Sequence, residues 1–159
     1  MKLEQELDLD LPFKDLFHET VLNIVRTAHL LDQIGAELFR RYDLTVAQFN
    51  VLVSLKYRER DLTQSDLSRR LVVTRASVTS VLDRLEAKGL VERNKVEGNR
   101  RIHHVALTTN GRTLLEEVEP LYFDAIHKTT DGMDQTECLA LITMLEKVRD
   151  NIRLRIQGV

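Results

Sequence analysis

The first long amphipathic segment of the chain runs from about Pro12 to Tyr42. Its apolar side chains recur at alternating spacings of four and three residues, the period of one helix face. They are Phe17, Val21, Ile24, Ala28, Leu31, Gly35, Leu38 and Tyr42. Pro12 suits a first helical turn, where no N–H donor is needed. A helix of about 30 residues spans roughly 45 Å, which is too long for one small core, so the pattern predicts a partner along its length.

Three shorter helices are predicted in the middle of the chain, each beginning after a threonine cap. These caps are Thr45, Thr63 and Thr74. Gln48 and Asp66 stand three residues after the first two caps, as in a capping box. The third helix runs from Arg75 to about Lys88 and ends at Gly89.

A β-hairpin is predicted directly after these helices. Leu90–Arg93 and Ile102–Leu107 read as short strands, and Gly98-Asn99 supplies the turn between them. Two helices joined by a short turn and followed by a hairpin form a winged helix-turn-helix pattern. The second helix of such a pair can enter the major groove of DNA.

The C-terminal third is predicted to hold two further helices. Thr108 begins the first, which runs to about Thr130 and is bent near Pro120. Asp134 and Glu137 form a capping box before the second. Its apolar positions again repeat in fours and threes: Leu141, Leu145, Val148, Ile152 and Ile156. The predicted fold is mainly α with a small β-hairpin wing, a winged helix-turn-helix flanked by long dimerisation helices. Its expected divisions are residues 1–43, 44–108 and 109–159.

Charge is unevenly distributed along the chain. The net charge is −2, yet residues 69–101 hold nine Lys and Arg against four acids, a local net of +5. Residues 1–19 hold six acids against two lysines, a net of −4. Because salt confines electrostatic attraction to about 8 Å, the basic segment favours a polyanionic partner, the alternative being a solvated basic face.

The third predicted helix divides into two faces. Val78, Val81, Leu82 and Leu85 share the face that packs inward. The opposite face carries small or polar residues: Ala76, Ser80, Asp83 and Ala87, flanked by Ser77, Thr79 and Arg84. Small side chains let a helix approach a groove closely, and hydroxyls can bond base edges or phosphates. A scaffold or protein-binding module without DNA binding is the alternative interpretation.

Four segments together resemble the MarR family of winged helix-turn-helix transcriptional regulators. They are LTVAQFNVL (44–52), LTQSDLSRRL (62–71), TRASVTSVLDRLEAKGLVER (74–93) and GNRRIHHVALTTNGRTLL (98–115). The resemblance implies a homodimer on double-stranded DNA at a palindromic operator, with a wing arginine in the minor groove. By position it implies these DNA-binding residues: Gln64, Ser65, Thr74, Arg75, Ser77, Thr79, Ser80, Arg84, Asn99, Arg100 and Arg101. Of the two wing arginines, the family pattern gives the minor groove to Arg101.

The chain departs from the family pattern at three positions. Asn99 stands where the wing usually has an aspartate that helps to orient nearby arginines. Val72 occupies a turn position where a β-branched residue tolerates positive φ poorly. Ser80 stands where many relatives carry arginine. These departures affect the operator sequence and the affinity rather than the fold.

Enzymatic, metal and redox functions have little support in the sequence. No GxSxG motif, Gly-rich phosphate loop or suggestive Cys/His spacing is present, and we expect no cofactor. His103 and His104 are neighbours on a strand and point to opposite faces, so they cannot chelate one ion together. Cys138 is expected to be an inert thiol, and one cysteine allows no internal disulfide. The N-terminus has no apolar signal-like run, and no stretch approaches membrane-helix length, so a cytoplasmic protein is expected.

The remaining question of function is whether a small-molecule effector regulates DNA binding. The resemblance implies release from DNA by aromatic or phenolic acids bound between the dimer helices and the winged domain. Arg26, His29 and Phe49 are candidates to line such a cleft. The alternative is that Arg26 is solvated and Phe49 belongs to the core.

Overall fold

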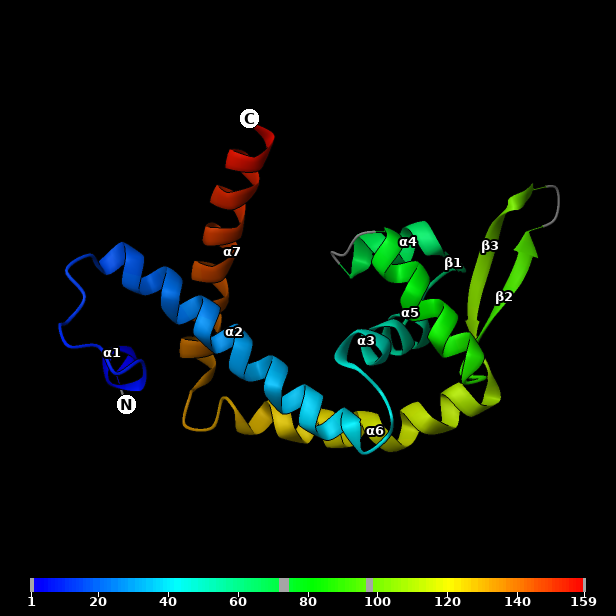
Figure 1. Cartoon of the computed structure of the whole chain (residues 1–159), viewed down its shortest axis with the longest axis horizontal. Helices are drawn as coiled ribbons and strands as arrows, with labels where there is room; N and C mark the ends of the chain where they lie inside the picture. Colours follow the sequence, from blue (N-terminus) through cyan, green and yellow to red (C-terminus); the bar gives the residue numbers. More distant parts are fainter. Residues whose placement is uncertain (1, 72–74, 97–98, 159) are drawn as a thin grey trace. The chain divides into compact units, whose positions relative to one another are not determined.

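The computed structural model describes residues 2–71, 75–96 and 99–158, with side chains described for 2–71, 78–95 and 103–158. The chain divides into two compact units, Met1–Phe123 and Asp124–Val159. Figure 1 shows the order of the helices and strands. Each unit is described by itself below.

The predicted long N-terminal helix is present, but it is shorter than expected. Helix α2 spans Leu16–Arg40 and is capped by Asp15, whose carboxylate accepts a hydrogen bond from the backbone N–H of Phe17 at 2.9 Å. The prediction that Pro12 lies in the first turn is therefore wrong, because the aspartate three residues later provides the cap. A short helix α1, Leu3–Glu6, precedes it and was not predicted.

The three middle helices lie where their caps predicted them. Helix α3 spans Val46–Lys56, α4 spans Gln64–Arg70 and α5 spans Arg75–Ala87. The capping boxes at the starts of α3 and α4 are both formed. Gly89 has a φ of +66°, a left-handed conformation that glycine adopts without strain, so it ends α5 as predicted. The predicted cap of α5, Thr74, lies outside the described residues.

The predicted hairpin belongs to a three-stranded antiparallel sheet. Strand β2 spans Val91–Val96 and β3 spans Asn99–Leu107, so both are longer than predicted. The additional strand β1, Leu62–Thr63, pairs with the far side of β3, and the strand order is β1-β3-β2. Leu62 lies opposite Val105, which joins the start of α4 to the base of the wing.

The two C-terminal helices begin at their predicted caps. Helix α6 spans Thr109–Lys128 with Pro120 inside it, and α7 spans Gln135–Gln157. Asp134 and Glu137 form the predicted capping box at the start of α7. None of the described helices is both long enough and apolar enough to cross a membrane.

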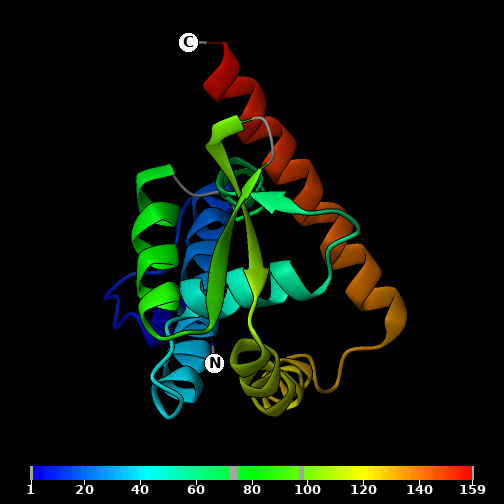
Figure 2. The ribbon, with the colours of Figure 1, turned by 90° about the vertical axis from the view of Figure 1, so that its right-hand side faces the viewer.

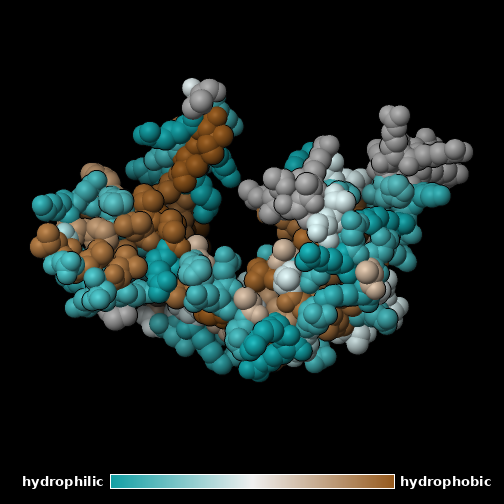
Figure 3. All heavy atoms as spheres, viewed as in Figure 1, coloured by the Kyte–Doolittle hydropathy of each residue, from teal (hydrophilic) through white to brown (hydrophobic). Residues whose placement is uncertain are grey.

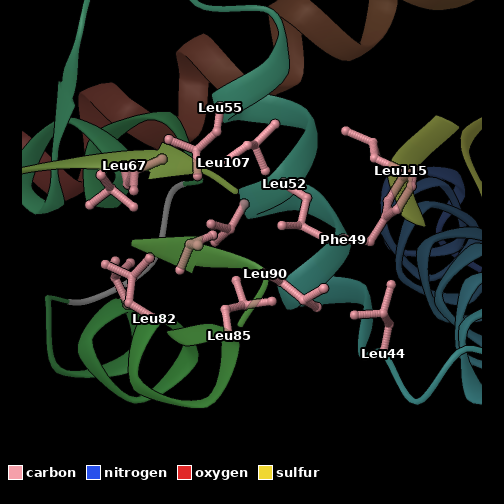
Figure 4. Close-up of a cluster of buried hydrophobic side chains, with 14 of the residues drawn as sticks. Leu44, Phe49, Leu52, Leu55, Leu67, Leu82, Leu85, Leu90, Leu107 and Leu115 are labelled. Carbon is pink, nitrogen blue, oxygen red and sulfur yellow. The ribbon is translucent and has the colours of Figure 1, made fainter. Parts of the chain in front are cut away.

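One hydrophobic core lies beneath α5 and the sheet. Figure 4 shows side chains from α3, α4, α5, the strands and α6 converging on it. Its labelled members are Leu44, Phe49, Leu52, Leu55, Leu67, Leu82, Leu85, Leu90, Leu107 and Leu115. At the α2 side, the rings of Phe39 and Phe49 stack with centroids 4.3 Å apart, and Tyr122 of α6 contacts both. The buried side chains of α5 pack into this core and fix the helix against α3, α4 and β2.

Candidate nucleic-acid interface

Helix α5 and the hairpin form one edge of the first unit. The start of α5 and the far end of the hairpin both lie on the upper side in Figures 1 and 2. Val78, Leu82 and Leu85 are at most 1% exposed, which confirms the inward face predicted for this helix. Because these side chains fix the rotation of α5, its opposite face is presented outward.

The outward face of α5 carries the small and polar side chains that periodicity predicted there. Ser80, Asp83, Arg84 and Ala87 are exposed, and Thr79 is half-buried. Together they line an open hollow of about 650 Å³. Apart from Arg84, this face carries no long side chain, so it can approach a groove of a double helix closely.

A side-chain hydrogen bond connects the two helices of the helix-turn-helix. The amide of Gln64, at the start of α4, donates to the hydroxyl oxygen of Thr79. Gln64 and Thr79 were predicted separately as DNA-binding residues, and they are therefore in contact with each other within the protein. Ser65, on the same turn of α4, is half-buried.

An arginine of the wing holds α5 in place. Arg93 of β2 contacts Asp83 at 2.6 Å and Glu86 at 2.5 Å, two acids that are three residues apart on α5. This double ion pair fixes the hairpin relative to the outward face of α5. The two acids stand one turn apart in the sequence, but their pairing with Arg93 depends on where the hairpin folds and was not predicted.

A second missed cluster lies at the start of α4. Asp66 accepts hydrogen bonds from the backbone N–H of Thr63 at 2.9 Å and from its hydroxyl at 2.7 Å. Arg60 and Arg69 bind the same carboxylate. The hydrogen bonds from Arg60, then those from Thr63 and Arg69, hold the pKa of Asp66 far below its ordinary value. The group therefore stays ionised, and its stabilising contribution is full above the ordinary pKa of an aspartate and is lost progressively as the pH falls from that pKa toward the lowered one.

Two lysines connect the winged domain to the adjoining helices. Lys88, just after α5, contacts the carboxylate of Asp43 at 2.9 Å, in the turn between α2 and α3. Asp43 has a φ of +51°, so the lysine supports a backbone conformation that non-glycine residues rarely adopt. Lys56 of α3 pairs with the buried Glu119 of α6, and this hydrogen bond raises the pKa of Lys56.

Comparison with known proteins places this arrangement in a family. The MarR family pattern matches residues 42–102. The multiple antibiotic resistance protein MarR of Escherichia coli (strain K12) is 33% identical over 139 residues, which cover 84% of this chain and 95% of that protein. The chain belongs to the MarR family.

Solved structures of similar proteins share the fold. A mutant MarR from Escherichia coli in complex with operator DNA is 32% identical, with a TM-score of 0.71 over 85% of this chain and 99% of that one. BpsR of Bordetella bronchiseptica, whose DNA binding is regulated by 6-hydroxynicotinic acid, is 28% identical, with a TM-score of 0.67 over 82% and 98% of the two chains. The winged helix-turn-helix architecture predicted from the sequence is thereby confirmed. Several of the similar proteins are named as transcriptional regulators.

Several residues of the predicted MarR-type site have no described side chain. They are Thr74, Arg75, Ser77, Asn99, Arg100 and Arg101. Val72 and the turn residue Gly98 lie outside the described residues altogether. Their assignments, including that of the minor groove to Arg101, remain predictions.

The structure places the three residues that were expected to line an effector cleft, Arg26, His29 and Phe49, in other surroundings. Phe49 is 1% exposed and belongs to the core, as the alternative interpretation held. Arg26 bonds Glu6 at 2.5 Å, and His29 contacts Gln33 at 3.0 Å on its own helix. A different, mainly apolar cleft of about 750 Å³ lies between α2, α3 and α5. Its lining includes Asp32, Ala36, Arg40, Val46, Asn50, Val51, Val78 and Val81.

The histidines and the cysteine form no metal-binding group in the described part of the chain. There, no three His, Cys, Asp or Glu side chains lie close enough together to hold an ion. His104 lies 3.7 Å from the carboxylate of Asp61. Cys138 is a free, half-buried thiol on α7.

Proposed function

We propose that this MarR family protein is a transcriptional repressor that binds a pseudo-palindromic operator as a homodimer. The outward face of α5 carries the proposal, because it is small, polar and exposed while the rest of the helix is anchored in the core. The operator complex of the similar MarR structure supports the same use of the fold. A helical protein-interaction module without DNA binding would not need such a face beside a hairpin.

The docking arrangement follows from that face. Helix α5 enters the major groove of one half-site, where the hydroxyls of Thr79 and Ser80 meet base edges and Arg84 meets phosphate. The hairpin reaches the adjacent minor groove with Arg101. Arg93 keeps these two elements at a fixed separation, since it bridges β2 and α5.

The dimer is proposed from apolar surfaces that a single chain leaves uncovered. On α2, Phe17 is 83% exposed and Val21 53%, and on α7 Ile152 is 51% and Ile156 72% exposed. Figure 3 shows an apolar strip along α7. Burying such area contributes about 25 cal/mol per Å². Residues 1–43 and 109–159 thus serve dimerisation, and residues 44–108 bind DNA.

Selection of binding sites from random duplexes tests the function. We expect the protein to enrich an inverted repeat whose half-sites lie about one helical turn, or a multiple of it, apart on DNA. Enrichment of no sequence, with no shift of any duplex at moderate salt, would favour the interaction module.

The cleft between α2, α3 and α5 is proposed as the effector site. Its mainly apolar lining suits an aromatic ring, and Arg40, one terminal nitrogen of which bonds Glu37, has further N–H donors for a carboxylate. A ligand there contacts both the dimerisation helix and the recognition helix.

Aromatic carboxylic acids are therefore expected to weaken DNA binding by the wild type, with 6-hydroxynicotinic acid and salicylate as probes. Val46→Trp, which fills the cleft, should abolish the response while leaving DNA binding in the absence of acid within about threefold. A response that survives this substitution would place the effector elsewhere.

A further inference from the structure

Two arginines share one aspartate at the start of α4. The carboxylate oxygens of Asp66 lie 2.8 Å and 3.3 Å from the two terminal nitrogens of Arg60. Arg69, one turn further along α4, contacts the oxygen that Arg60 approaches more closely. Because a single carboxylate faces two guanidinium groups, one positive charge of the cluster is not compensated within it.

The negative and positive side chains of this cluster differ in their exposure to solvent. The Asp66 side chain is 7% exposed, whereas those of Arg60 and Arg69 are 63% and 76% exposed. The negative group therefore lies inside, and the positive groups face solvent. An approaching polyanion meets the guanidinium groups first, and the buried carboxylate holds them in place.

The arginines retain hydrogen-bond donors after binding Asp66. A guanidinium has five N–H donors in a fixed planar fork. Within the described part of the chain, Arg69 uses only one terminal nitrogen, and the Nε of Arg60 has no partner. A fork that is already oriented loses less rotational freedom when it binds a phosphate.

The cluster lies beside the outward face of α5. Gln64, two residues before Asp66 in the first turn of α4, bonds Thr79 on that face. In Figures 1 and 2, α4 lies at the same upper edge as the start of α5 and the far end of the hairpin. A duplex whose major groove receives α5 would pass its backbone close to α4.

We propose that Arg60 and Arg69, oriented by Asp66, form a phosphate clamp for the DNA backbone beside the groove that α5 enters. This inference rests on the proposed function and adds two residues that the sequence pattern did not assign to DNA. The clamp contributes affinity and orientation and does not read the base sequence.

The salt dependence of operator binding tests the clamp. Each phosphate contact contributes about −0.9 to the slope of log affinity against log salt. Arg60→Ala and Arg69→Ala should each make the slope shallower by about 1.8 for a dimer, and should weaken selected and random DNA alike. Arg60→Lys should restore most of the slope, since a lysine keeps the charge. Arg112→Ala is the matched control, because it removes an exposed arginine from the first turn of α6, at the base of the hairpin and away from the edge where α4 lies, and its slope should equal that of the wild type.

The alternative is that both arginines only stabilise the start of α4. In that case the alanine variants would lower the melting temperature but leave the slope unchanged, and this result would overturn the clamp. A changed base preference would also contradict it. A wild type that binds no DNA would instead refute the proposed function, so the two failures are distinguishable.

Discussion

Replacing Gly111 by alanine is expected to destabilise the protein by about 3 kcal/mol or more, beyond the usual cost of one added methyl in a core. Gly111 lies in the first turn of α6, and its backbone N–H donates to the hydroxyl of Thr108 at 3.0 Å. A Cβ at this position would collide with the backbone carbonyl oxygen of Leu90, which also accepts from the N–H of Thr108 at 3.2 Å. Because the obstacle is backbone, α6 would have to move away from the sheet.

Urea unfolding at a fixed protein concentration measures this effect. Asn110→Ala is the matched control, since it changes the neighbouring exposed residue of the same turn and should shift stability by less than about 0.5 kcal/mol. A Gly111→Ala variant within about 1 kcal/mol of the wild type would show that α6 does not pack against Leu90 as described. The expected loss of stability would instead give the glycine of the LTTNG segment (107–111) a physical reason, which is the close approach of α6 to the backbone just before β2.

Replacing Ile152 by glutamate is expected to abolish the dimer at micromolar concentration. The side chain is 51% exposed in the single chain and lies in the predicted apolar seam of α7, so the monomer fold should tolerate the change. Burial of such a side chain is worth about 2 kcal/mol, and it occurs twice in a symmetric dimer. The loss of about 4 kcal/mol corresponds to roughly a thousandfold weaker association.

Sedimentation analysis of the variant and the wild type measures the mass of each assembly in solution. The wild type should sediment at twice the 18.4 kDa mass of the chain, and Ile152→Glu at the monomer mass with unchanged helix content. Asn151→Glu introduces the same charge at the adjacent exposed polar residue and should remain a dimer. A wild-type monomer, or a dimeric Ile152→Glu, would refute the proposed interface.

Local signals in the sequence predicted most of the fold. The capping boxes that begin α3, α4 and α7 can be recognised from four consecutive residues, and the end of α5 can be recognised from a single glycine. The two faces of α5 followed from helical periodicity, and the buried Val78 and exposed Ser80 confirm them.

Features that depend on tertiary contacts were missed. Strand β1 has two residues and exists only because Leu62 pairs with Val105, more than forty positions away. The ion pairs of Arg93 with α5 depend on where the hairpin lies relative to the helix. Arg60 and Asp66 are closer in sequence, but only the structure shows that the acid is buried while the arginine is exposed.

Whether α5 reads the operator is measured by selecting binding sites from random duplexes with the wild type and matched variants. The wild type and Thr113→Ala, which removes an exposed hydroxyl from α6, should enrich the same inverted repeat. Thr79→Ala and Ser80→Ala should each relax the preference at particular positions of both half-sites, because the hydroxyls of α5 are proposed to meet base edges. If both α5 variants select the same sequence as the wild type with undiminished preference, α5 does not read the operator and the proposed docking is refuted.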